Sequence, residues 1–145
     1  MAEFTYNPVQ TVLANQAVIL NTSIPCQKGY VFHRNEFGIV TLRGIVNNPC
    51  SNFARYQVTF NGNIAVSTGG NVGPISIALA IDGEPIQTSR AIVTPAAVGD
   101  YFNVTSTAFI TVLKGCCEAI SVVNVTEDGS SIDVQNSNLV ITRVA

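Results

Sequence analysis

The stretch that decides the fold is GPISIALAIDGEPI, residues 73–86. Large and small side chains alternate along it with a period of two. The large ones are Ile75, Ile77, Leu79 and Ile81, and the small ones are Ser76, Ala78 and Ala80. This alternation predicts a β-strand whose two faces meet different surroundings, and Asp82-Gly83 predicts the tight turn of a hairpin. Because the small face carries no charge, we expect it to be covered rather than to meet water.

Short segments of the same kind extend in both directions from this strand. Residues 11–26, 29–44, 55–70, 89–100, 101–113, 117–125 and 130–145 each hold one or two expected strands, separated by Gly, Asn and Pro turns. No segment has the 3.6-residue period of an amphipathic helix. Eight to ten short strands in one chain predict an all-β domain, a sandwich or a barrel of antiparallel strands.

The composition excludes several classes of partner. Charged residues make up 11% of the 145 residues and the net charge is −2, whereas an ordinary soluble domain has about 25% charged residues. No basic run is present that could neutralise phosphates, so we expect no nucleic-acid partner. No apolar run approaches the roughly 20 residues of a membrane span, so we expect no membrane partner. The low charge favours burial of part of the surface in an oligomer or a larger assembly.

Cysteine spacing gives no metal-binding pattern. The four cysteines are Cys26, Cys50, Cys116 and Cys117, and no CxxC pair occurs. Structural zinc is therefore not expected. We expect free, packed thiols, while a Cys26–Cys50 disulfide stays open because pairing depends on geometry that spacing does not fix.

The sequence has no recognisable catalytic set. His33 is the only histidine, and no nucleophile elbow lies near it, so a structural histidine is the favoured interpretation. Adjacent Glu127 and Asp128 have the chemistry of calcium ligands, but a solvated turn is favoured. We therefore predict no enzyme activity, no cofactor, no metal site and no catalytic residue.

The order of the segments resembles the C1q/TNF-like jelly roll. The resemblance rests on YQVTFNGNIAV, ISIALAIDGEPI, YFNVTSTAFITVLKGCCEAISVVNV and the terminal LVITRVA, and it covers roughly residues 11–145. Cys116 stands where an acidic residue is usual in the family, which argues against a calcium role. The resemblance implies an antiparallel β-sandwich of jelly-roll type. It also implies a trimer packed around a threefold axis.

A second set of segments resembles small structural proteins of bacteriophages and prophages of gut Firmicutes. These segments are HRNEFGIVTLRG, GNIAV, GGNVGPISIALAIDGEP, TPAAVGDYFNV and NLVITRVA. The resemblance implies a head decoration or head-fibre protein that contacts a phage capsid or another virion protein. The N-terminal MAEFTYNPVQ has no signal-peptide pattern. The expected location is thus the virion, after synthesis in the bacterial host cytoplasm.

Two sets of residues follow as candidates for this architecture. The expected trimer interface contains Ala78, Ala80, Thr107, Ala108 and Phe109, and the alternative is a monomeric sandwich whose second sheet face meets loops. Residues 1–10 are expected to form an N-terminal arm that docks onto the virion through Phe4, Tyr6 and Pro8, ahead of a single domain at 11–145. The alternative function is a receptor- or carbohydrate-binding module on a phage fibre or on a bacterial cell or spore surface. Its site would lie in loops 45–54, 68–73 and 126–131, and a host-surface glycan would be its ligand.

Overall fold

The computed structural model describes residues 1–24, 29–33 and 38–145. Within these ranges the chain forms twelve strands and one short 3-10 helix, η1 (Gln87–Ser89). The strands are β1 (Ala2–Tyr6), β2 (Gln10–Val12), β3 (Thr22–Ile24), β4 (Val31–His33), β5 (Val40–Arg43), β6 (Phe53–Val66), β7 (Ile75–Ile81), β8 (Glu84–Pro85), β9 (Ala91–Val93), β10 (Phe102–Leu113), β11 (Cys117–Asn124) and β12 (Ile132–Arg143). The number exceeds the expected eight to ten because several strands are only two or three residues long. No helix in the described ranges is long and apolar enough to cross a bilayer.

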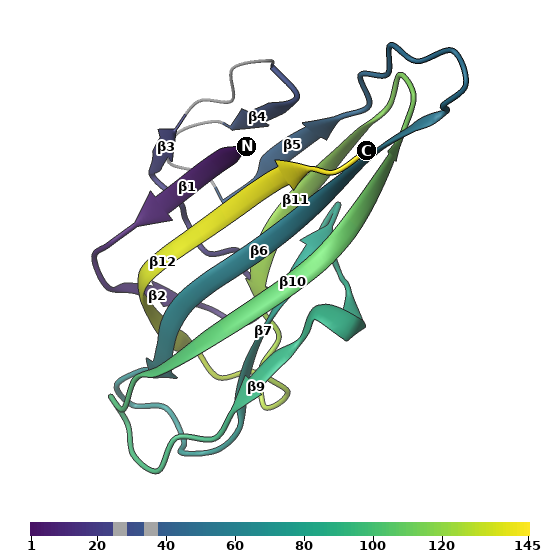
Figure 1. Ribbon diagram of the computed structural model, residues 1–145. Helices are drawn as coiled ribbons and strands as arrows, with labels where there is room; N and C mark the ends of the chain where they lie inside the picture. Colours follow the sequence, from purple (N-terminus) through teal and green to yellow (C-terminus); the bar gives the residue numbers. More distant parts are fainter. Residues whose placement is uncertain (25–28, 34–37) are drawn as a thin grey trace.

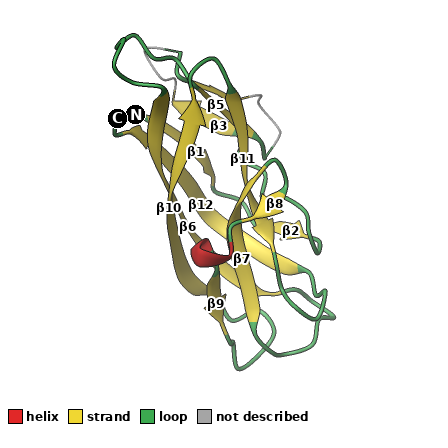
Figure 2. Cartoon of the chain, turned by 90° about the vertical axis from the view of Figure 1, so that its right-hand side faces the viewer, coloured by secondary structure: helices red, strands yellow, loops and turns green. Residues whose placement is uncertain are grey.

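The strands form two antiparallel sheets that face each other (Figure 1, Figure 2). Sheet A has the order β10-β6-β12-β1-β3, with β2 also paired to β12, and sheet B has the order β4-β5-β11-β7-β8, with β9 also paired to β7. Neighbouring strands come from opposite ends of the chain, as where β1 pairs with β12. Such wrapping of two sheets is typical of a jelly roll. Both termini lie at the same end of the sandwich, away from β9 and the loop between β11 and β12.

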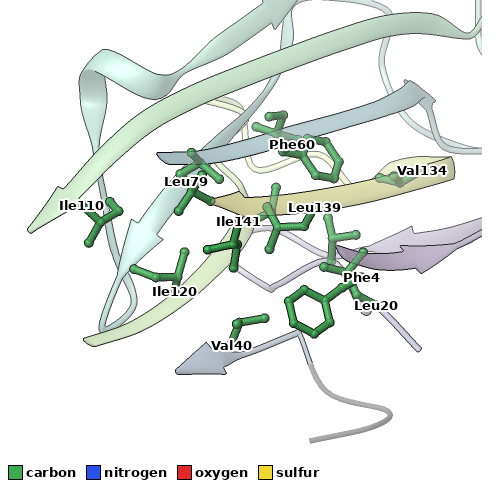
Figure 3. Close-up of a cluster of buried hydrophobic side chains, with 14 of the residues drawn as sticks. Phe4, Leu20, Val40, Phe60, Leu79, Ile110, Ile120, Val134, Leu139 and Ile141 are labelled. Carbon is green, nitrogen blue, oxygen red and sulfur yellow. The ribbon is translucent and has the colours of Figure 1, made fainter. Parts of the chain in front are cut away.

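The period of two places one side of each long strand in the core between the sheets. Sheet A contributes large residues from β6, β10 and β12, and sheet B contributes them from β5, β7 and β11. Figure 3 shows side chains of this core meeting in one cluster, and those labelled are Phe4, Leu20, Val40, Phe60, Leu79, Ile110, Ile120, Val134, Leu139 and Ile141. The hairpin predicted at Asp82-Gly83 joins β7 to β8, with φ of 51° and 83° at the two residues. Positive φ at both central positions is the geometry that such a turn requires.

Both faces of β7 are buried within a single chain. Ile75, Ile77 and Leu79 point into the core, and the small residues on the other face are covered as well, with Ala78 at 1% and Ala80 at 0% exposure. At the end of this face the Arg90 side chain crosses to the outside of β7 and its Nε donates a hydrogen bond to Ser76 Oγ. The prediction that Ala78 and Ala80 meet another subunit is therefore wrong, because neither has surface left to offer.

The N-terminal residues are part of sheet A and not a free arm. β1 pairs along its whole length with β12 and also with β3. Phe4 is 3% exposed in the core, Tyr6 packs against the core, and only Pro8 is fully at the surface. The expected docking arm at residues 1–10 is thus corrected. The alternation of Ala2 and Phe4 with polar residues drives this segment into the sheet, because burial removes a large aromatic side chain from water.

Candidate functional site

Three large apolar side chains lie together on the outer face of sheet A. They are Phe53, Phe109 and Leu113, which are 41%, 53% and 60% exposed, and we call them the apolar patch. Phe53 and Leu113 are direct partners across β6 and β10. Between this pair and Phe109, the Arg55 guanidinium carbon lies 5.2 Å from the centroid of the Phe109 ring. Exposed apolar side chains grouped on one sheet face mark an interaction surface.

The same face continues as a ladder of uncharged polar side chains. Thr59 and Thr107 hydroxyls are 3.2 Å apart, Thr105 Oγ1 donates to Asn61 Oδ1 at 3.0 Å, and Asn103 Nδ2 donates to Asn63 Oδ1 at 3.1 Å. β10 carries no charged side chain, and the only charged side chain of β6 is Arg55. Because these polar groups already have partners within the subunit, covering them costs less than covering unpaired groups. The face is therefore suited to burial against protein.

The remaining predicted interface residues divide between this face and the core. Thr107 and Phe109 lie on the outer face and are exposed, whereas Ala108 points inward and packs against the core. Sequence analysis missed Phe53 and Leu113. They become neighbours only through the pairing of β6 with β10, which joins residues 60 positions apart and leaves no signal in either strand alone.

A second feature is a hollow of about 400 Å³ on the outer face of sheet B, which we call the Arg90 pocket. Its lining residues are Pro74, Ser76, Arg90, Ile92, Glu127 and Asp128. The pocket forms where the loop after β11 approaches the starts of β7 and β9. Of the loops predicted to form a binding site, 126–131 contributes Glu127 and Asp128 to the lining, whereas no residue of 45–54 or 68–73 lines the pocket.

Arg90 is held in place by three contacts at once. Its Nε lies 3.1 Å from Ser76 Oγ, its Nη2 lies 3.1 Å from the Val125 carbonyl oxygen, and its Nη1 lies 3.3 Å from Glu127 Oε1. The Glu127 side chain is 83% exposed, so this ion pair adds little stability by itself. The three contacts fix the direction in which the edge of the Arg90 guanidinium points.

Asp128 is held by the turn that follows β11. Its Oδ1 accepts a hydrogen bond from the Ser130 backbone N–H at 2.9 Å. Hydrogen bonds from Ser130 lower the pKa of Asp128 below its ordinary value, so this carboxyl is ionised at neutral pH. Glu127 thus forms an ion pair with Arg90, and Asp128 stabilises the turn. The described ranges contain no group of three or more His, Cys, Asp or Glu residues placed to hold a metal ion.

A shallower hollow of about 500 Å³ lies further along sheet B, beside the β7–β8 hairpin, and includes Ile39, Asp82 and Ser121 among its lining residues. Glu118 is close to this hairpin. Partial burial of Glu118 raises its pKa, and its hydrogen bond to Asp82 and the charge of that carboxyl add to the effect. Glu118 and Asp82 are both acidic, so this hollow does not offer a positive and a negative group side by side to a ligand.

The residues considered for catalysis and disulfide bonding belong neither to the apolar patch nor to the Arg90 pocket. The His33 ring centroid lies 4.6 Å from that of Phe4, a packing contact between the two sheets. Cys50, Cys116 and Cys117 are free thiols and all three are exposed, so the prediction of packed thiols is wrong for them. Cys26, and with it the alternative Cys26–Cys50 bridge, lies outside the described residues.

No protein-family model and no curated protein matches the sequence. Solved structures do match. The globular domain of zebrafish complement 1qA protein has a TM-score of 0.55 at 13% identity, over 96% of this chain and 94% of that one. Eiger TNF from S. frugiperda has a TM-score of 0.63 at 12% identity, over 100% of this chain and 92% of that one. The EclA C-terminal domain, described as a sugar-binding protein, has a TM-score of 0.45 at 17% identity, over 94% and 79%. The first two likenesses confirm the predicted C1q/TNF-like jelly-roll fold.

Proposed function

We propose that this protein is a non-enzymatic homotrimeric module that assembles through the outer face of sheet A. The observation that carries the proposal is the apolar patch, Phe53, Phe109 and Leu113, on two strands whose only charged side chain is Arg55. The three side chains lie outside the core, so folding of one subunit does not need them. Contact with further copies removes them from water and explains why a surface strand carries them.

The choice of a trimer rests on the C1q/TNF-like resemblance of the sequence, which implies a threefold axis. Energetics are compatible with this assembly. Completing the burial of a half-exposed Phe or Leu favours association by about 1 kcal/mol. Each subunit of the ring supplies one such patch. The polar ladder beside the patch limits the opposing cost of desolvation because its members pair within the subunit.

The experiment is light scattering coupled to size-exclusion chromatography over a range of protein concentrations. We expect a mass near three times the chain mass of 15.4 kDa. A mass of one chain at every concentration would remove the proposal, and a stable dimer would remove the threefold axis.

The second sequence resemblance favours a bacteriophage particle as the location of the trimer. The sequence segments quoted for that resemblance support this setting, in which the protein would act in capsid decoration or as a head-fibre protein. Because β1 belongs to sheet A, a virion contact would use a surface of the folded sandwich and not a detachable arm. Co-sedimentation of the purified protein with undecorated capsids of the parent phage tests this setting.

A further inference from the structure

We infer that the Arg90 pocket is a binding site for a neutral, hydroxyl-rich ligand, the end of a carbohydrate chain. Its volume of about 400 Å³ lies within the range of about 300–1,000 Å³ typical of small-molecule sites. The inference does not depend on the proposed trimer, because all the lining residues come from one subunit.

The pocket offers hydrogen-bond donors and acceptors side by side. The three contacts of Arg90 use one N–H on each of its nitrogens, which leaves one N–H on each terminal nitrogen for a ligand. The Glu127 carboxylate next to it is an acceptor only, and 83% of its side chain is exposed. Adjacent hydroxyls of a sugar ring match this pair, since one can accept from the guanidinium while the other donates to the carboxylate.

Apolar side chains form another part of the pocket wall. Ile92, on β9, is 60% exposed, and Pro74 lies beside the start of β7. Ile92 is the Cα partner of Ser76, so its position next to Arg90 is fixed by the pairing of β9 with β7. The aliphatic C–H face of a sugar ring can pack on such side chains while the ring hydroxyls reach the charged groups.

Charge and rigidity narrow the class of ligand. One arginine and two carboxylates give the lining a net charge of −1, which disfavours an anionic sugar and favours a neutral one. Arg90 has its three contacts and Asp128 its turn hydrogen bond, so little side-chain freedom is lost on binding. Contacts of this number, without an aromatic platform among the lining residues, give a dissociation constant on the order of 1 mM for a single sugar.

The pocket and the apolar patch lie on opposite sheets. The patch is on the outer face of sheet A, and Ile92 and Arg90 are on the outer side of sheet B, near β9 in Figure 1. Assembly through sheet A would therefore leave the pocket open to solvent. The two sites can be tested by separate substitutions in the same chain.

The test begins with an array of neutral oligosaccharides printed beside their sialylated and sulfated counterparts. We expect saturable binding to a subset of neutral glycans and weaker binding to the acidic versions. The affinity for the best free oligosaccharide is then measured by calorimetry. Glu127→Ala should weaken it about tenfold or more, the loss of a hydrogen bond to a charged group. Ile92→Ser should weaken it as well.

The matched control is Glu84→Ala, because Glu84 is also an exposed carboxylate but belongs to β8 and does not line the pocket. It should bind with unchanged affinity. Phe109→Lys should also keep the affinity per subunit, whether or not it assembles, and this separates failure of the pocket from failure of the trimer. The inference is overturned if no glycan binds saturably, if acidic glycans bind best, or if Glu127→Ala and Ile92→Ser bind like the unmodified protein.

Discussion

Replacing Phe109 by lysine is the most direct test of the proposed assembly through the outer face of sheet A. The ring is 53% exposed and points away from the core, so the subunit should fold without it. The two strands of this region, β6 and β10, contain no carboxylate, and the one charged group on them is the cation Arg55. A lysine ammonium buried here by neighbouring subunits would have no partner on these strands.

The size of the effect follows from two contributions. Loss of the ring removes about 1 kcal/mol of apolar burial per copy, and an unpaired buried ammonium costs several kcal/mol. Their combination exceeds about 3 kcal/mol per contact, which corresponds to more than a hundredfold weaker association. The subunit itself should lose at most about 1 kcal/mol from the poorer strand propensity of lysine.

The assay is light scattering across a dilution series, with circular dichroism to confirm that the variant is folded. Ile92→Lys is the matched control, since Ile92 is a comparably exposed strand residue on sheet B. We expect Phe109→Lys to be a folded monomer where the unmodified protein and Ile92→Lys are trimers. The reasoning is refuted if Phe109→Lys keeps the trimer mass at the same dilutions, or if Ile92→Lys dissociates equally.

Four further predictions concern the folding and stability of the subunit, each checked by denaturation. Phe4→Ala should lower the free energy of unfolding, measured by urea titration, by about 3–5 kcal/mol. Removal of residues 1–10 should prevent folding, because β1 is paired within sheet A, whereas a free arm would be dispensable. Tyr56→Phe should cost about 1–3 kcal/mol, because its buried hydroxyl donates to the Arg43 carbonyl oxygen at 2.6 Å; an unchanged midpoint would contradict this. The raised pKa of Glu118 means that the folded state holds this proton more tightly than the unfolded chain, so its contribution to stability is present at low pH and is lost as the pH rises through the raised pKa. Glu118→Gln should accordingly raise the melting temperature slightly at neutral pH and leave it unchanged well below the ordinary pKa of a glutamate, and an equal shift at both pH values would exclude this cause.

Local patterns in the sequence were sufficient to predict the fold class. The alternation in residues 75–81 and the Asp82-Gly83 turn are properties of adjacent residues, and both are found where they were expected. The same rule, applied to Ala2 and Phe4, would have revealed β1. A pattern of only five residues does not distinguish a paired strand from an extended arm, which is why the sequence favours an arm there.

The candidate surfaces depend on contacts between distant segments, which no local pattern contains. The uncharged face of β7 was correctly expected to be covered, but sequence could not show that its own chain covers it. The pairing of Phe53 with Leu113 and the reach of Arg90 to the Val125 carbonyl oxygen arise only when the strands are placed in register. The sequence of a strand predicts which side chains share a face. Which segments pack against that face is determined only by the tertiary structure.

The position of the two chain ends determines which end of the domain faces away from anything attached to a terminus. Both termini lie at one end of the sandwich, and β9 with the loop after β11 lies towards the other (Figure 1, Figure 2). A tether joined to either terminus would therefore leave from the end remote from Arg90 and hold that pocket outermost. Fluorescent or affinity tags placed at the N- or C-terminus should for the same reason be tolerated without blocking access to it.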